Sequence, residues 1–584
     1  MRKISFKPLA LIILAATLFA SCSSLQKMKK NADQIDFKVT PEILEAHGGD
    51  VDVAINGLFP ASYFNKKVTV VATPVLKYEG GEKAFEPVTL QGEKVDANNK
   101  VISYSTGGSF AYKDAVAFDD AMRLSDLEIR ITASQGSKSV DFEPIKVADG
   151  VLATSTMVLN FPSPIIGIQR EKNTTGIYDP NLDKFQRVVP DEYVADIHYL
   201  INSSYVRGTE LKGDDVKELY AYAKDAFEAE RKDLKGIEIS AYASPDGELD
   251  WNSKLSQQRE GSSNKVVSTQ LKKDKVEAAL KTKFTPEDWD GFKEMMEKSS
   301  IQDKELILRV LSMYSDPEVR EREIKNLSQA FTVVADEILP KLRRAKISAS
   351  VDLIGKTDEE IAALAESNPA SLNPAELLYA ATLTTDKNKQ LSIYNSCMKV
   401  YPKDWRGYNN AGMVLAQQMK FADAKPLFEK AEGLASSEPI IKNNLGAVAL
   451  FEGDIKKAES LFGAASGAGD EVNYNLGIVA MKKGEYDKAV KLFGTTDSPN
   501  LGLAKILAGD NNGALKALEN CTWEGCYMKE YFKAVVGART AKENLMFESL
   551  GKVVEMQPKL KAKIATDMEF AKYFDDPKFK AIVE

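Results

Sequence analysis

The sequence predicts a multidomain chain with a β-rich N-terminal part, an α+β middle part and an all-helical C-terminal part. Alternating apolar patterns separated by turn residues run over about 36–165, as in a β-sandwich. Strand and helix patterns then succeed one another between 190 and 355. Finally, a glycine recurs at spacings of 34, 31 and 25 residues within 372–540, which indicates a solenoid of repeated helix pairs.

The composition excludes several classes of function. The 584 residues indicate about three to five domains, at about 100–200 residues each. The 77 Lys and Arg are outnumbered by 85 Asp and Glu, a balance that disfavours a role in binding nucleic acid. With only His47 and His198, the chain has no His-rich metal site, and neither histidine has a triad-like neighbourhood. We predict no metal and no cofactor.

Residues 1–21 have the pattern of a signal peptide. Arg2, Lys3 and Lys7 form a positive start, and Leu9 to Phe19 is apolar except for Thr17. A membrane-spanning helix needs about 20 apolar residues, so this run is too short to be one.

The next motif, Leu18-Phe19-Ala20-Ser21-Cys22, resembles the lipobox of bacterial lipoproteins. The resemblance implies that Cys22 carries acyl chains such as palmitate, which anchor the protein in a membrane. Ser23 stands where an Asp would retain a lipoprotein in the inner membrane, and no acidic cluster follows it. We therefore expect a lipidated linker over 22–35, attached to the outer membrane and facing the periplasm. The alternative is a soluble secreted protein in which Cys22 is incidental.

The segment 36–165 reads as a β-sandwich-like domain, with an immunoglobulin-like arrangement as one form. Val51, Val53 and Ile55 lie on one face of a strand, and Leu127–Thr132 alternates in the same way. Ser134-Gln135-Gly136-Ser137 separates that strand from the next and predicts a hairpin. Such a module is more often a spacer or docking surface than a catalyst.

The middle part alternates strands and helices. Ile197, Tyr199 and Ile201 indicate a strand that continues to Ser204, and a helix follows over 214–231. A second strand, Ile237–Tyr242, ends in a turn, and a helix runs on from Asn252 through Leu271.

These residues resemble the OmpA-like, peptidoglycan-associated domain, which has a GHTDxxG loop, an NxxLSxxRA helix and a late NRRV strand. Without a gap, Gly247, Asn252, Leu255, Ser256 and Arg259 fall at the family spacings. Leu342-Arg343-Arg344-Ala345-Lys346-Ile347 resembles the late strand. The resemblance covers about 190–355.

In that family a loop Asp and the motif Arg hold the diaminopimelate residue of peptidoglycan. Arg259 stands at the Arg position, whereas Ser244 replaces the Asp and Asp246 lies two residues further on. Asn252 and Arg343 complete the candidate peptidoglycan-binding residues. Two interpretations stay open. Either the pocket binds peptidoglycan weakly or in a modified way, or the domain docks protein and Arg259 makes a structural salt bridge.

The domain departs from the family by a helical insertion over 272–341. Thr285-Pro286 and Ser315-Asp316-Pro317 are helix-start signals. The insertion either covers the pocket or binds a partner, or it is a helical pair with its polar side in water.

Four glycines mark the C-terminal repeats, and each is followed by Ala twelve residues later and by a large apolar residue sixteen residues later. These residues are Gly412, Gly446, Gly477 and Gly502; Ala424, Ala458, Ala489 and Ala514; and Phe428, Phe462, Phe493 and Leu518. Small residues let two helices approach closely, so the spacing predicts helical hairpins.

The strings Tyr408-Asn-Asn-Ala-Gly412 and Tyr474-Asn-Leu-Gly477 resemble the first helix of tetratricopeptide repeats. The resemblance implies a solenoid over 372–540 that holds a protein partner, with 375–402 as a capping repeat and 541–584 as a helical cap. Asn410, Asn444 and Asn475, each two residues before a glycine, are candidates to bind partner backbone. The alternative is ordinary helix-surface polarity.

Three cysteines remain, Cys397, Cys521 and Cys526. In an oxidising compartment Cys521 and Cys526 can form a disulfide, and half-buried thiols are the other interpretation. No C-x-x-C motif is present.

No nucleophile–base pair, phosphate loop or metal-binding spacing appears in the sequence. We predict a non-enzymatic, lipid-anchored adaptor that tethers an envelope complex to the outer membrane, with a second attachment to peptidoglycan left open. The alternative is a subunit of an outer-membrane assembly or secretion machine whose OmpA-like domain docks protein.

Overall fold

A computed structural model describes residues 24–160, 164–168, 183–301 and 304–584. The chain forms two compact units, one of Met1–Asp183 together with Leu377–Glu584 and one of Lys184–Glu376. The β-rich part and the helical repeats therefore belong to one unit, although an α+β unit separates them in the sequence. The predicted signal peptide and Cys22 lie outside the described residues.

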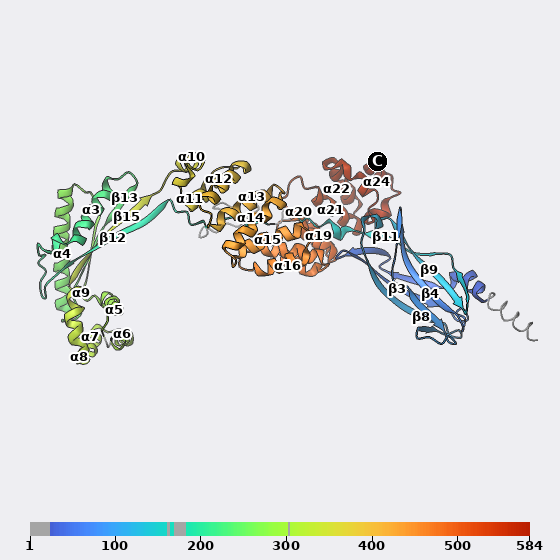
Figure 1. Cartoon of the computed structure of the whole chain (residues 1–584), viewed down its shortest axis with the longest axis horizontal. Coiled ribbons are helices and arrows are strands. Elements are labelled where there is room, and N and C mark those ends of the chain that lie inside the picture. Colours follow the sequence, from blue (N-terminus) through green and yellow to red (C-terminus); the bar gives the residue numbers. More distant parts are fainter. Residues whose placement is uncertain (1–23, 161–163, 169–182, 302–303) are drawn as a thin grey trace, which may run out of the picture. The chain divides into compact units, whose positions relative to one another are not determined.

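The first part of the first unit is a β domain with eleven strands (Figure 1). The strands are β1 (Asp36–Thr40), β2 (Ile43–His47), β3 (Asp50–Phe59), β4 (Thr69–Tyr78), β5 (Gly81–Ala84), β6 (Val88–Gly92), β7 (Lys100–Ile102), β8 (Gly108–Ala117), β9 (Ser125–Gln135), β10 (Lys138–Asp141) and β11 (Ile145–Leu152). They are hydrogen-bonded in the order β1-β3-β2-β11-β9-β4-β6-β7, with β8 on β3, β10 on β9 and β5 on β4. The predicted hairpin is present as β9–β10, where Lys138 pairs with Gln135.

One hydrophobic core fills this domain. It combines inward residues of β3, such as Val53, with inward residues of β4 and β9, such as Val70 and Ile129, so the sheet folds over on itself. Burial alternates along β9, as expected when one face of a strand meets the core.

The expected linker 22–35 is instead part of the β domain, as far as it is described. Residues 24–30 are helical, and Leu25 and Met28 are buried in the core of the domain. The physical reason is the spacing of these two apolar side chains, which places them on the same side of a helix.

The second unit is an α+β domain. Its four strands, β12 (Val188–His198), β13 (Lys232–Tyr242), β14 (Leu280–Thr285) and β15 (Arg344–Ile354), follow the order β12-β15-β13-β14. Helices α3 (Asp214–Glu228) and α4 (Leu249–Asp274) bury Leu219 and Val267 in one core with strand residues such as Ile239 and Ile347.

The structure corrects three details of the predicted α+β domain. The first strand ends at His198 rather than Ser204, since Leu200 and Ile201 lie in an exposed turn. Strand β14 was missed, because its edge position leaves the run Leu280–Thr285 without buried residues or an alternating pattern. Thr285 is therefore the last residue of a strand, and Asp288 caps the following helix by accepting a hydrogen bond from the amide of Gly291.

The insertion forms a helical subdomain with its own core. Its helices gather at one end of the unit (Figure 1): α5 (Trp289–Lys298), α6 (Lys304–Met313), α7 (Pro317–Asn326), α8 (Ser328–Glu337) and α9 (Leu339–Leu342). Phe292, Ile307 and Ile324 pack together in that core. The expected start at Asp316-Pro317 is present, with Asp316 as the N-cap of α7. One further helix of this unit, α10 (Asp358–Ser367), follows β15.

Successive helices form the C-terminal part of the chain (Figure 1). They are α11 (Pro374–Ala380), α12 (Lys387–Val400), α13 (Trp405–Gln417), α14 (Phe421–Leu434), α15 (Pro439–Phe451), α16 (Ile455–Ala464), α17 (Glu471–Lys482), α18 (Tyr486–Phe493), α19 (Pro499–Leu507), α20 (Asn511–Asn520), α21 (Tyr527–Arg539), α22 (Glu543–Met556), α23 (Lys561–Ile564) and α24 (Pro577–Val583). The marker glycines lie where the helices of a pair cross. A Cβ on Gly412, Gly446 or Gly477 would lie 2.5–2.7 Å from the phenylalanine ring sixteen residues later. The array is thus a solenoid of the tetratricopeptide type.

The boundary expected at 540 divides a helical hairpin. α21 and α22 pair like the preceding helices, and a Cβ on Gly537 would lie 2.7 Å from the amide nitrogen of Met546. Ser549 and Val553 follow Gly537 by twelve and sixteen residues and are buried, so the spacing rule extends to this pair. It was missed because Ser replaces Ala and Val replaces the large apolar residue.

Candidate functional site

The first helices of the repeats carry a ladder of asparagines on the side away from the hairpin partners. It comprises Asn409 and Asn410 on α13, Asn443 and Asn444 on α15, Asn475 on α17 and Asn500 on α19, and all six are fully buried. We call this set the asparagine ladder. Six buried primary amides in one groove need hydrogen-bond partners, because an unsatisfied buried amide costs free energy.

Their partner is an extended segment of the same chain, Pro164-Ile165-Ile166-Gly167-Ile168, which we call the strap. Asn410 accepts from the amide of Ile168 at 2.7 Å and donates to the carbonyl of Ile168 at 2.7 Å. Asn444 holds Ile166 in the same two-way manner, at 2.8 and 2.7 Å. Each of these amides therefore satisfies both the backbone donor and the backbone acceptor of one strap residue.

The rest of the ladder continues this pattern. Asn443 and Asn475 donate to the carbonyl of Pro164 at 2.9 and 3.1 Å. Pro164 has no N–H, so its carbonyl is the group that needs a partner here. Further along, Asn500 accepts from the amide of Leu159 at 2.9 Å and donates to its carbonyl at 2.8 Å.

The ladder forms hydrogen bonds with every second residue of the strap. Bound carbonyls at 164, 166 and 168 are two residues apart, the repeat of an extended chain at about 3.3 Å per residue. The asparagines also bond one another: Asn444 donates to Asn409 at 2.8 Å and Asn475 donates to Asn443 at 2.9 Å. The ladder is therefore a preorganised network rather than a set of separate contacts.

Side chains of the strap add a shape requirement. Ile165, Ile166 and Ile168 are buried. Gly167 faces Met413, and a Cβ at position 167 would lie well inside the contact distance of the Met413 sulfur. The groove thus accepts an apolar extended chain with glycine at this position.

The three asparagines expected to bind partner backbone, Asn410, Asn444 and Asn475, do bind peptide backbone, and that backbone is their own chain's. Sequence reasoning missed Asn500, although it too stands two residues before a marker glycine. It also missed Asn409 and Asn443, and the Asn-Asn pairs in two repeats were the signal that could have found them.

In the second unit, the five residues expected at the OmpA-like pocket come together. Ser244 and Asp246 lie in the loop after β13, Asn252 and Arg259 on α4, and Arg343 just before β15. Arg343 pairs with Asp246 at 3.1 Å and donates to the Ser244 hydroxyl at 3.3 Å, and Ser244 also donates to Asp246. Asn252 donates to the carbonyls of Ser244 and Gly247 at 3.2 and 3.1 Å, which fixes the loop.

Arg259 lies beneath this cluster and is 1% exposed. Its guanidinium donates to three main-chain carbonyls, those of Ser203 at 2.9 Å, Tyr242 at 2.8 Å and Leu200 at 3.2 Å. It also lies over the Tyr199 ring at 5.0 Å. Burial lowers the pKa of Arg259 to about 10. Arg259 therefore joins the loop after β12 to the end of β13 through main-chain carbonyls, not through the salt bridge that one of the two interpretations assigned to it.

A second, half-buried arginine was not expected. Arg344 pairs with Asp196 at 2.9 Å and with Asp288 at 3.1 Å, and it lies over the Tyr242 ring. Asp288 is also the N-cap of α5, so this pair connects the sheet to the helical insertion. Burial raises the pKa of Asp288.

Beside Arg259, the α+β unit exposes large apolar side chains. Tyr205 is 73% exposed, Ile201 62% and Leu200 56%. Trp251, at the start of α4, is 53% exposed and donates to Asn202 at 3.3 Å. These residues form an apolar rim adjoining the Asp246–Arg343 pair.

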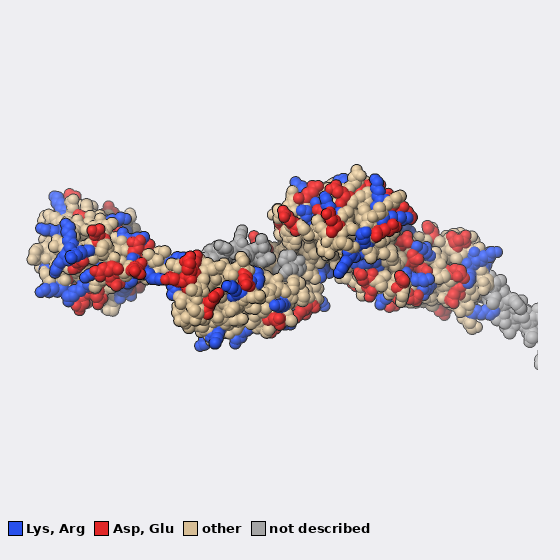
Figure 2. Space-filling model, turned by 90° about the horizontal axis from the view of Figure 1, so that it is seen from above, with Lys and Arg blue, Asp and Glu red and all other residues tan. Residues whose placement is uncertain are grey.

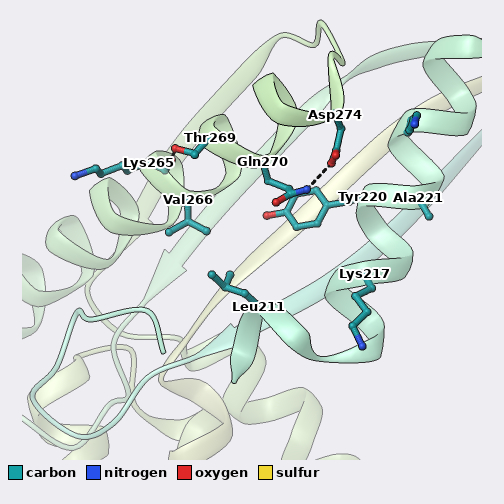
Figure 3. Close-up of a pocket in the computed structure, with 10 residues that line it drawn as sticks. Leu211, Lys217, Tyr220, Ala221, Lys265, Val266, Thr269, Gln270 and Asp274 are labelled. Atoms are coloured by element: carbon teal, nitrogen blue, oxygen red, sulfur yellow. Dashed lines mark hydrogen bonds between the residues drawn. The ribbon is translucent and has the colours of Figure 1, made fainter. Parts of the chain in front are cut away.

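A separate cavity of about 560 Å³ lies between α3 and the C-terminal half of α4 (Figure 3). Tyr220 extends toward Gln270, which donates to Asp274 at 2.7 Å. Lys217 and Lys265 line the rim, and burial raises the pKa of Tyr220 to about 12. These residues include no nucleophile paired with a base.

The cysteines, possible metal sites, membrane spans and surface charges can also be compared with the sequence expectations. Cys397, Cys521 and Cys526 are separate thiols, and burial raises the pKa of Cys521 to about 11. In the described part of the chain, no three His, Cys, Asp or Glu residues are grouped so as to hold a metal ion. Among the described helices none is both long and apolar enough to cross a bilayer. Acidic and basic side chains are interspersed over the visible surface (Figure 2).

The fold and the asparagine ladder thus define a repeat protein whose groove holds an extended peptide. No family model matches the chain, and no curated protein does. Among solved structures, a tetratricopeptide protein described as having an unusual peptide-binding site, YrrB, is 23% identical over 29% of this chain and 97% of its own, with a TM-score of 0.23. PilW, a type IV pilus biogenesis factor, is 12% identical over 39% and 98%, with a TM-score of 0.28. A tetratricopeptide protein from Parabacteroides merdae is 13% identical over 42% and 99%, with a TM-score of 0.29.

Proposed function

We propose that this protein is a non-enzymatic adaptor, lipid-anchored through Cys22 in the outer membrane and facing the periplasm. In this role the β domain and solenoid act as one scaffold, and the α+β unit supplies the attachment to another envelope component. The observation that carries the proposal is the strap. The strap, held by Asn410 and Asn444, and Leu159, held by Asn500, couple the β domain to the repeats.

The strap also bears on where protein partners bind. The asparagine ladder is occupied by the chain itself, so a partner that used Asn410 or Asn444 would first have to displace Ile166 and Ile168. We propose that partners contact the solenoid outside this groove.

For the α+β unit, the proposal is an OmpA-like domain that binds peptidoglycan in a modified way. A stem peptide offers an ammonium and a carboxylate, which call for one acid and one guanidinium. The partly exposed pair Asp246 and Arg343 has this complementarity. Arg259 then supports the site from below, since three of its N–H donors bind main-chain carbonyls.

Co-sedimentation with purified peptidoglycan sacculi tests this proposal. We expect the full chain to sediment, and we expect Asp246→Asn and Arg343→Gln to reduce binding by roughly tenfold each, about 1.4 kcal/mol. Arg231→Gln is the matched control, because Arg231 pairs with Glu360 at the surface of the same unit. Sedimentation of all three variants at the level of the unaltered chain would contradict this use of the pair.

A second candidate function is docking of protein by the α+β unit, as in an assembly or secretion machine. The apolar rim of Leu200, Ile201, Tyr205 and Trp251 favours it, because exposed apolar patches next to aromatic anchors are typical of protein interfaces. Failure of the unaltered chain to sediment with sacculi would favour this candidate. It predicts that Tyr205→Ser, but not Arg231→Gln, changes the mass of the complex isolated from membranes.

A further inference from the structure

The N-terminal helix leaves almost no length of chain between the anchor and the β domain. Leu25 is fully buried and Met28 is 4% exposed, both in the core of the domain. Polar contacts fix the same turn. Ser24 donates to Gln135 at 3.1 Å, Tyr63 donates to the carbonyl of Met28 at 2.8 Å, and Lys29 pairs with Glu143 at 3.1 Å. Residues 24–30 are therefore a packed element of the domain rather than a tether.

The covalent distance to the anchor follows from the sequence. Leu25 is three residues after Cys22, and an extended chain spans at most about 3.6 Å per residue. If acyl chains on Cys22 lie in the bilayer, Leu25 lies within about 11 Å of the point where they enter it.

The strand register shows which end of the β domain this is. Gln135 is the last residue of β9, Thr69 at the start of β4 pairs with Ser134, and Asp36 at the start of β1 pairs with Leu58. The loop 60–67 and the segment 93–107 lie at this end too, because the amide of Ser62 donates to the carbonyl of Tyr104 at 2.7 Å. We call this end of the β domain the anchor end.

The opposite end contacts the solenoid. His47 at the end of β2 shares a 2.8 Å hydrogen bond with Tyr486, and a Cβ on Gly48 would lie 3.1 Å from the carbonyl oxygen of Lys483. β9 has Ser125 at that end and Gln135 at the anchor end, about 33 Å apart at about 3.3 Å per residue.

Side chains at the anchor end suit a lipid headgroup layer. Leu58, Val101 and Tyr104 are 52%, 49% and 38% exposed, although they are large and apolar. Lys66 lies 5.7 Å from the Tyr104 ring. Tyrosine and lysine side chains together are typical of membrane interfaces, where the ring lies at headgroup level.

The lysines of the N-terminal helix also suit a lipid surface, although acidic side chains lie at the same end of the domain. Lys27 and Lys30 are exposed on the helix that follows the anchor. Lysine side chains near an anionic lipid surface are attracted to it. The carboxylates at this end include Glu93 and Glu143, which pair with Lys66 and Lys29. Asp33, Asp36 and Asp96 are exposed there as well.

We propose that the anchor end of the β domain lies directly on the phospholipid surface, with Tyr104, Val101 and Leu58 in the headgroup layer. The domain then stands as a spacer of fixed length between the membrane and the solenoid. This inference rests on the proposed lipidation of Cys22, and it adds a lipid-contacting surface to it.

Quenching by doxyl-labelled phospholipid tests the contact. The full lipidated chain, with Cys526→Ser to remove the partly exposed thiol, is placed in vesicles of phosphatidylethanolamine and phosphatidylglycerol. A fluorophore is attached at Ser137→Cys, in the β9–β10 turn, or at the exposed control position Ala121→Cys, near the start of β9. We expect quenching at 137 to exceed quenching at 121 at least fivefold.

Inserting ten Gly and Ser residues between Ser23 and Ser24 is the second arm. We expect it to bring quenching at 137 to the level at 121, since the domain is then free to leave the surface. Equal quenching at the two positions without the insertion would overturn the inference while leaving lipidation intact. If the unaltered chain incorporated no more labelled acyl chain than Cys22→Ala, both the anchor and the inference would be overturned.

Discussion

At the scale of single residues, Gly167 decides whether the strap fits its groove. A methyl group there would collide with the sulfur of Met413, and Met413 is itself buried in α13. We expect Gly167→Ala to lower the free energy of unfolding by about 1–3 kcal/mol, the cost of overpacking. Chemical denaturation monitored by circular dichroism measures it.

The control for this variant is Gly551→Ala. Gly551 lies in α22 with open space where its Cβ would be, so the change should stabilise the helix by up to about 1 kcal/mol. Equal stability of the two variants would show that the strap is not tightly packed in solution.

Arg259 is a second decisive residue, and its role is structural support. Arg259→Lys replaces three directed donors by one ammonium, which cannot reach the carbonyls of Leu200, Ser203 and Tyr242 together. We expect the α+β unit to lose about 1–3 kcal/mol, the cost of buried acceptors left unpaired. Protease sensitivity of the loop 199–206 should rise in parallel, and unchanged sensitivity would contradict the assigned role.

At the scale of elements, the sequence predicted the helical hairpins well because their determinants are local. Gly412 and Phe428 are sixteen residues apart and touch across one turn, so spacing alone reveals the contact. Strand β14 escaped prediction because Lys281 and Lys283 are the residues expected at a solvent-facing edge, not in a buried strand.

Of the two candidate sites, the one with local determinants could be predicted from the sequence and the one formed by a long-range contact could not. The loop Ser244–Gly247 and the helix with Arg259 could be placed from a motif, because their spacing lies within one strand–turn–helix segment. The partner of Asn410 could not be predicted, because Ile168 lies 242 residues earlier and the sequence around neither residue indicates the contact.

At the scale of the whole first unit, the joint between β domain and solenoid should depend on pH. His47 pairs with Glu45 at 3.0 Å and bonds Tyr486, and the hydrogen bond from His47 lowers the pKa of Glu45. A carboxyl whose pKa is lower in the folded state contributes stability above its unfolded pKa of about 4.5, and this contribution is lost as pH falls through the folded value.

We therefore expect the stability of the unaltered chain to fall below about pH 4.5 more steeply than that of Glu45→Gln, which lacks this titrating group. Thermal unfolding between pH 3 and 7 measures the difference. Parallel curves for the two proteins would show that Glu45 titrates alike in the folded and unfolded chain.

The strap also has a consequence for the order in which this chain becomes structured. The backbone of Leu159 can bind Asn500 only after 341 further residues have been made, and that of Ile166 can bind Asn444 only after 278. During synthesis or export, the β domain can close on its local contacts, but Ile166 and Leu159 stay bound to water until the second and fourth of the glycine-marked repeats emerge. The α+β unit lies between the strap and the repeats in the sequence, so these contacts form only after that unit has been made.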